Sequence, residues 1–154
     1  MSIDKILAFI AKCENPKELK IIIKNAKAKA DNGVAGAAFK RLVGLVPSEK
    51  PGTIEYDFWR SINAFELLLS DERGKTIRLT RTRQKIAKVG IFQTLQDLTL
   101  SSKPSRGFSM LLERQMPELT AEAVVLRHCQ TFADNVVAAA RDRLVKANVD
   151  VGRL

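Results

Sequence analysis

Two sets of basic residues recur along this chain with identical spacing. The first set is Lys17, Lys20, Lys24 and Lys27, and the second is Arg78, Arg81, Lys85 and Lys88. On an α-helix the intervals i, i+3, i+7 and i+10 place four side chains on one face, along about 15 Å of the axis. Like charges at these intervals repel one another, so their repetition predicts a face that binds an external polyanion.

The second set lies in a strongly basic segment. Asp97 is the only acidic residue between positions 73 and 107, and hydroxyl and amide side chains alternate with the basic ones. Nucleic-acid phosphates are contacted by this mixture of cationic and neutral donors. We therefore expect Lys75 and the second basic set to contact phosphates. Arg83 and Gln84 are of the types that can contact base edges in a major groove.

Two other interpretations of the basic faces stay open. Exposed lysines favour solubility, so either face can be a solvated surface, and for the second set the acidic segment 53–72 would neutralise part of the charge. Either face can also meet an acidic protein. No aromatic residue is interleaved with either set, so the sequence does not indicate a surface on which single-stranded bases stack.

The stretch 83–91 resembles the middle of a helix-turn-helix motif. Ala87 would be the small residue of the first helix, Gly90 the glycine of the turn, and Ile91 the apolar residue that follows. The interval from Ala87 to Gly90 is one residue shorter than usual, and the resemblance covers only about 20 residues. It implies two helices joined at Gly90 and assigns no role to any side chain.

Residues that suggest phosphate-loop or metal chemistry form no complete motif. The triplet 74–76 (Gly-Lys-Thr) matches the end of a phosphate-binding loop, but Leu69 stands where that loop needs a glycine. His128, Cys129 and Cys13 fall short of the about four ligands of a zinc site, and their spacing is not that of a zinc motif. We predict no bound metal and no cofactor.

Paired carboxylates are the remaining candidates for catalysis. Glu118 and Glu122 are four residues apart and can converge, as can Glu55 and Asp57 less readily. We interpret these pairs as solvated charges near helix starts, because no glycine-rich or histidine-bearing context accompanies them. The sequence therefore names no catalytic residue and predicts a protein that is not an enzyme.

Composition limits the classes of protein to consider. The chain has 154 residues, of which 45% are apolar and 28% charged, and its net charge is +9. This is enough apolar material for a core and too little polar bias for disorder. No apolar run approaches the ~20 residues of a membrane span, and the N-terminus lacks the pattern of a signal peptide. With two cysteines only, a reducing cytoplasm is the expected location.

Apolar residues recur at helical intervals almost throughout, so we predict an all-α bundle of seven to nine helices. Asn15-Pro16 and Thr53 are strong helix starts, and Gly90 should break or bend a helix. The expected helices span 3–12, 16–30, 33–46, 54–72, 80–89, 91–98, 108–115, 118–128 and 131–147.

The segment 47–52 holds two prolines and a glycine and is the expected linker. It would separate a three-helix N-terminal unit, 1–46, from a main helical domain, 53–147. Residues 148–154 are expected to fray.

The favoured function is non-enzymatic binding of nucleic acid, with double-stranded DNA preferred over RNA. In that interpretation the Lys17 set extends the footprint of the Arg78 set. The alternative is a protein-interaction module or adaptor for an acidic partner. Dimerisation through the 54–72 or the 130–147 helix fits this second interpretation.

Overall fold

The computed structural model describes residues 2–154. Within this range the protein has eight α-helices and no strand, and 73% of it is helical, which confirms the all-α prediction. The chain divides into two compact units, Met1–Ser48 and Glu49–Leu154. The division between Ser48 and Glu49 falls inside the proline- and glycine-rich segment 47–52.

The first unit consists of α1 (Ile3–Lys12), α2 (Pro16–Ala28) and α3 (Asn32–Leu45), and α3 packs against both other helices. The predicted start of α2 is confirmed, because the Asn15 side chain accepts a hydrogen bond from the Lys17 backbone N–H at 3.0 Å. Leu19 and Ala26 of α2 are fully buried. Ile22 and Ile23 of the same helix are only half-buried.

The second unit begins with the long helix α4 (Ile54–Arg73), which Thr53 caps as predicted by accepting from the Tyr56 backbone N–H at 3.1 Å. It continues through α5 (Thr80–Leu100), α6 (Arg106–Glu113), α7 (Ala121–Arg127) and α8 (Asp134–Lys146). Helix α4 contacts α5, α6 and α7, while α8 lies against α5 and α7. The shared core contains Phe58, Ile62, Leu95, Val124, Val125, Phe132 and Val136.

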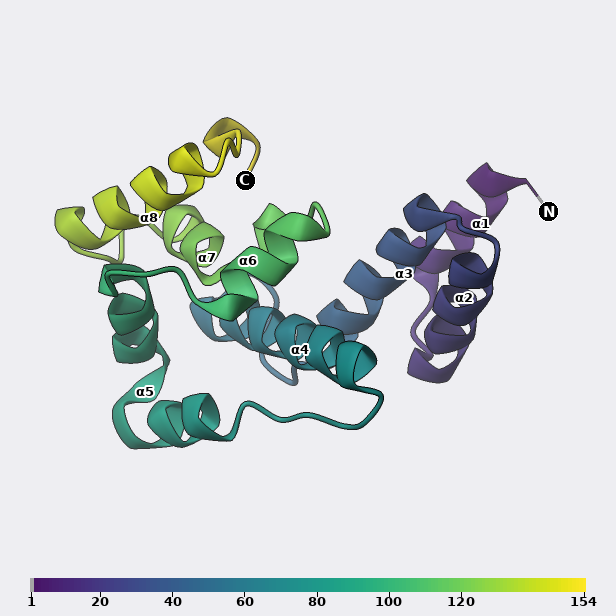
Figure 1. The fold of residues 1–154 in the computed structure, drawn as a ribbon, viewed down its shortest axis with the longest axis horizontal. Coiled ribbons are helices and arrows are strands. Elements are labelled where there is room, and N and C mark those ends of the chain that lie inside the picture. The colour runs from purple at the N-terminus through teal and green to yellow at the C-terminus, as the bar shows by residue number, and fades with distance from the viewer. Residues whose placement is uncertain (1) are drawn as a thin grey trace. The chain divides into compact units, whose positions relative to one another are not determined.

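Helix α5 is interrupted at Gly90, as the sequence predicted. Gly90 has φ 88° and ψ 167°, a backbone conformation that is essentially restricted to glycine. The Thr94 hydroxyl donates a hydrogen bond to the Gly90 carbonyl at 2.8 Å and so stabilises the break. The two halves, residues 80–89 and 91–100, run in different directions (Figure 1).

Three details differ from the predicted elements. Helix α8 begins at Asp134 after Ala133, without a side-chain cap, rather than at Thr131. The segment predicted as one helix over 118–128 is a 3-10 turn, η1 (Pro117–Leu119), followed by α7. Residues 148–154, expected to fray, include the 3-10 turn η2 (Val151–Arg153). No helix within residues 2–154 is both long enough and apolar enough to cross a membrane.

Candidate nucleic-acid interface

The first basic set forms a continuous exposed face on α2. Lys17, Lys20, Lys24 and Lys27 all lie within the helix and are exposed, while Leu19 and Ala26 are buried on the side that packs against α3. Within residues 2–154, Lys17, Lys20 and Lys24 take part in no ion pair. This face therefore carries at least three positive charges that the first unit does not neutralise by direct pairing.

The second basic set is divided between a loop and a helix. Arg81, Lys85 and Lys88 lie on the first half of α5, whereas Arg78 precedes the helix in the segment that follows α4. All four side chains are exposed. Because Arg78 lies outside the helix, helical spacing places only Arg81, Lys85 and Lys88 on one face.

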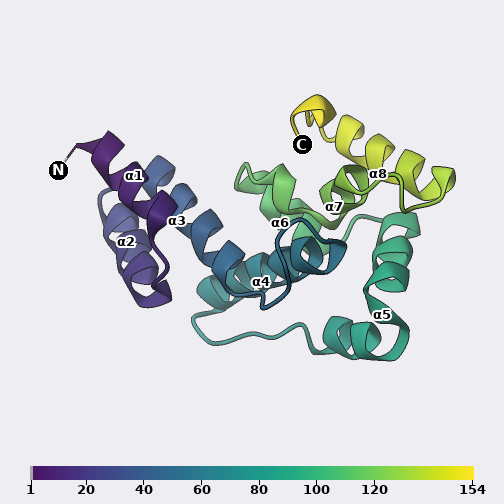
Figure 2. The same cartoon turned by 180° about the vertical axis from the view of Figure 1, so that it is seen from behind.

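Two side chains of α4 fix the segment that carries Arg78. The Ser70 hydroxyl accepts a hydrogen bond from the Ile77 backbone N–H at 2.8 Å, and the Glu66 carboxylate accepts one from the Leu79 N–H at 2.8 Å. The segment 74–79 consequently runs back alongside α4 (Figures 1 and 2). Glu66 thus caps α5 from a neighbouring helix, since Leu79 at the cap position makes no side-chain bond of its own.

The same carboxylate binds Arg83. Arg83 Nε donates to Glu66 Oε2 and Nη2 donates to Oε1, both at 2.7 Å, and the guanidinium lies 5.1 Å from the centre of the Trp59 ring. Burial alone would raise the pKa of Glu66. The hydrogen bonds from Arg83 and Leu79 and the positive charges of Arg83 and Arg78 outweigh burial, so the pKa is lowered. Arg83, predicted as a base contact, is occupied by this pair.

Lys85 forms an ion pair that bridges the break in α5. Its Nζ lies 2.6 Å from Oδ2 of Asp97 on the second half, and the Gln93 amide donates to Asp97 Oδ1 at 2.9 Å. Hydrogen bonds from Lys85 and Gln93 lower the pKa of Asp97. Both partners of the ion pair are about two-fifths exposed. The pair is therefore weak, because water and other anions compete with Asp97 for Lys85.

The remaining basic side chains of this surface are exposed and available. Lys75, Arg81 and Lys88 take part in no ion pair within the described residues. The positive charge of Arg78 helps to lower the pKa of Glu66, although the Arg78 side chain stays exposed. We call Lys75, Arg78, Arg81 and Lys88 the α5 basic surface, and Gln84 is exposed on the same half of α5.

Two acidic side chains elsewhere in the second unit, Asp57 and Glu122, are buried in ion pairs. Asp57 lies 2.7 Å from His128 Nε2, 3.4 Å from Arg127 and 3.6 Å from Arg60. The interpretation of Asp57 as a solvated charge is therefore wrong. Its partners Arg127 and His128 come from α7 and the residue after it, about 70 positions along the chain, and local spacing does not show them.

Glu122 is also buried, although the sequence suggested a solvated charge. Arg143 of α8 donates to it at 2.8 Å and also donates to the carbonyls of Leu98 and Ser101, which closes the end of α5. Cys129 is exposed and Cys13 is buried. No group of three or more His, Cys, Asp or Glu side chains is arranged to hold a metal ion in residues 2–154.

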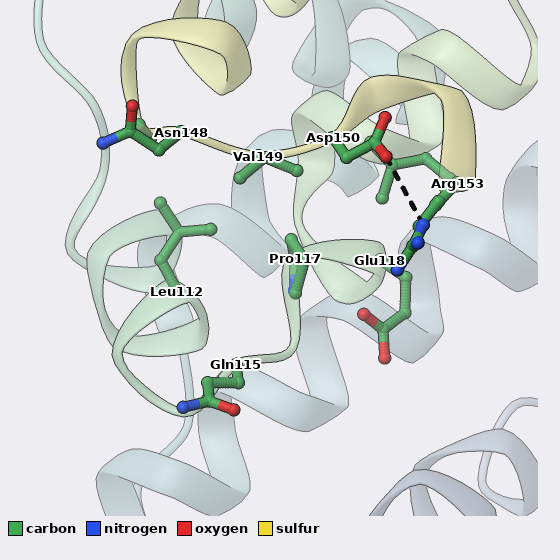
Figure 3. A pocket seen from close by; sticks show the side chains of 10 residues that line it. Leu112, Gln115, Pro117, Glu118, Asn148, Val149, Asp150 and Arg153 are labelled. Carbon is green, nitrogen blue, oxygen red and sulfur yellow. Dashed lines mark ion pairs between the residues drawn. The ribbon is translucent and has the colours of Figure 1, made fainter.

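A hollow of about 510 Å³ lies near the end of the described chain (Figure 3). Leu112, Pro117 and Val149 give it apolar walls, and Asp150 and Arg153, which form an ion pair 3.4 Å long, also line it. Its lining contains no histidine, cysteine, serine or lysine. The hollow therefore lacks a pair of nucleophile and base of the kind that acyl transfer needs.

No protein-family model matches this chain, and no curated protein or solved structure is significantly similar to it.

Proposed function

We propose that the second unit binds the phosphate backbone of double-stranded DNA through the α5 basic surface. One observation carries this proposal: Glu66 and Asp97, two acidic groups that contact the segment 79–85, are already paired with Arg83 and Lys85. Lys75, Arg81 and Lys88 consequently take part in no ion pair in the described chain, and Arg78 stays exposed. Surface cations of this kind gain affinity by releasing counterions from DNA.

The segment that carries these cations is held in place before DNA arrives. Its two backbone hydrogen bonds to Ser70 and Glu66 restrict the loop around Arg78, so less conformational entropy is lost on binding. In this proposal Arg83 is a positioning residue, because it holds Glu66 in the geometry that caps α5. Gln84, exposed beside Arg83 in sequence, is the candidate for a contact with base edges.

The lysine face of α2 supplies a second surface of the same chemistry. Its four lysines extend over about 15 Å at ~1.5 Å per residue, which is the axial rise of about four phosphates of one DNA strand. Binding by both faces would add their phosphate contacts and steepen the dependence on salt.

The proposal is tested by removing three charges from the α5 basic surface. The variant carries Arg78→Ala, Arg81→Ala and Lys88→Ala, and its control carries Arg114→Ala, Arg141→Ala and Lys146→Ala, three exposed basic residues elsewhere in the same unit. Affinity for a labelled duplex is measured at ~50 mM salt. We expect at least a tenfold loss in the variant and a small loss in the control. Equal losses would contradict a localised interface and indicate a net-charge effect.

One observation favours the second candidate function, an adaptor for an acidic protein. Ile21 on α2 is 58% exposed, and it lies four residues after Lys17 and three before Lys24, so the three side chains are neighbours. A DNA backbone gives an exposed isoleucine nothing to contact, whereas an acidic amphipathic helix would cover it. Under this candidate, the first unit alone binds an acidic amphipathic peptide, and Ile21→Ser weakens that binding without changing affinity for duplex DNA.

A further inference from the structure

Phe92 is an exposed aromatic ring with a fixed orientation. It lies two residues after the Gly90 break, and its ring stacks on that of Phe132 with centroids 4.8 Å apart and planes 5° from parallel. Phe132 is buried in the core, whereas Phe92 is 42% exposed. One face of the Phe92 ring is therefore supported from within the protein, and its exposed area lies on the other face and the edge.

The neighbours of Phe92 are of two chemical kinds. On its own half of α5, Gln93 is exposed and Gln96 half-buried, and both present amide groups. The preceding half carries Lys88 and Arg81 of the α5 basic surface. The helix thus carries an exposed aromatic ring, amide side chains on the same half, of which Gln93 also donates to Asp97, and unpaired cations on the preceding half. These are the kinds of group that bind a nucleotide, which has an aromatic face, polar base edges and a charged phosphate.

We propose that the outer face of Phe92 stacks an unpaired nucleobase, so that the protein binds single-stranded as well as duplex DNA. The inference rests on the proposed function, because the α5 basic surface would hold the flanking phosphates. The ring is held parallel to Phe132 before binding, so a base that stacks on it extends an existing stack and orders no loose side chain. Stacking of this kind tolerates any base, because each base has an aromatic face.

Two features of the chain make the position of the Phe92 ring difficult to predict from the sequence. Phe92 follows Lys88 by four residues, but the non-helical Gly90 between them means that ordinary helical spacing does not place the two side chains. Phe132, which fixes the ring, is 40 residues further along the chain, and nothing in the local pattern joins it to Phe92.

The test compares two single strands that differ only in their bases. One is a thymine oligonucleotide of ~12 nucleotides, about the length that a single binding module covers. The other has abasic sites at its centre and keeps every phosphate. We expect the wild-type protein to bind the first about tenfold more tightly. Phe92→Leu, which keeps an apolar contact with Phe132, should abolish this preference.

Two further variants keep the test specific. Phe92→Tyr retains the ring and should retain the preference. Val89→Ala removes another exposed apolar side chain at the same break, 44% exposed, and should also leave the preference unchanged. The inference is overturned if wild-type protein binds both strands equally, or if Phe92→Leu keeps the preference. If duplex binding persists in either of these cases, the proposed function still stands. If wild-type protein binds neither single-stranded nor duplex DNA at low salt, both the inference and the proposed function are refuted.

Discussion

The Glu66 carboxylate and the Arg83 guanidinium meet in a two-point ion pair, with Nε–Oε2 and Nη2–Oε1 distances of 2.7 Å. The pair joins α4 to the first half of α5, and Glu66 also accepts the Leu79 backbone N–H. The buried Glu66 carboxylate thus anchors the most basic region of the protein. Arg83, which pairs with it, is not available to bind another anion.

Replacing Arg83 should destabilise the second unit. Arg83→Ala leaves the Glu66 carboxylate buried without its main partner, and breaking a buried pair in this way costs ~3–5 kcal/mol when both groups are fully buried. Because the Arg83 side chain is 30% exposed, we expect the free energy of unfolding, measured in urea, to fall by about 2–4 kcal/mol.

Arg81→Ala is the matched control, since Arg81 is exposed on the same half-helix and takes part in no ion pair in the described chain. Its unfolding free energy should change by less than ~0.5 kcal/mol. An equal loss in both variants would show that helix propensity rather than the ion pair dominates.

The loss of stability at acid pH should depend on Glu66. Its pKa in the folded protein lies below the ordinary value of 4.5, so the unfolded chain binds the proton more tightly. The stabilisation is therefore complete above the unfolded pKa and is lost as pH falls through the folded pKa. Unfolding followed from pH 6 to about pH 3 should show a shallower loss of stability in Glu66→Gln than in wild type. Parallel curves would contradict this role.

Much of the fold is predictable from the sequence, but the buried ion pairs of the second unit are not. Asn15 and Thr53 start helices because their side chains accept hydrogen bonds from free N–H groups within three residues, and Gly90 breaks α5 through its own backbone freedom. These are local causes. The burial of Glu66, Asp57 and Glu122 depends on arginines and a histidine 17 to 71 residues away, so the positional patterns that predict helices do not reveal it.

Gly90, the only glycine of α5, should be costly to replace. A Cβ at this position meets nothing within 4 Å, so the cost of Gly90→Ala comes from the backbone conformation, and ~1–3 kcal/mol is expected. Gly33→Ala in α3 is the control, because its Cβ would lie at an ordinary 3.6 Å from Asp31 and helical alanine is favoured over glycine. Thermal unfolding should show a lower midpoint in the first variant and an unchanged or higher one in the second.

Asp97 should weaken DNA binding by holding Lys85. Asp97→Asn removes the carboxylate from an exposed pair and frees one cation beside the α5 basic surface. We expect tighter duplex binding, by a few-fold at ~50 mM salt, and a salt dependence that corresponds to about one additional phosphate contact. Glu113→Gln, an exposed acid on α6, has the same change in net charge and should have a smaller effect. Equal gains in the two variants would indicate long-range charge rather than release of Lys85.

The most direct test of the central claim is the slope of duplex affinity against salt between ~50 and ~200 mM. Each phosphate neutralised contributes about −0.9 to the slope of log K against log salt. We predict a steep slope for wild type and a slope shallower by about two to three in the variant lacking Arg78, Arg81 and Lys88, with the Arg114, Arg141 and Lys146 control close to wild type. A wild-type affinity that does not change with salt, or no binding at the lowest salt, would contradict the account.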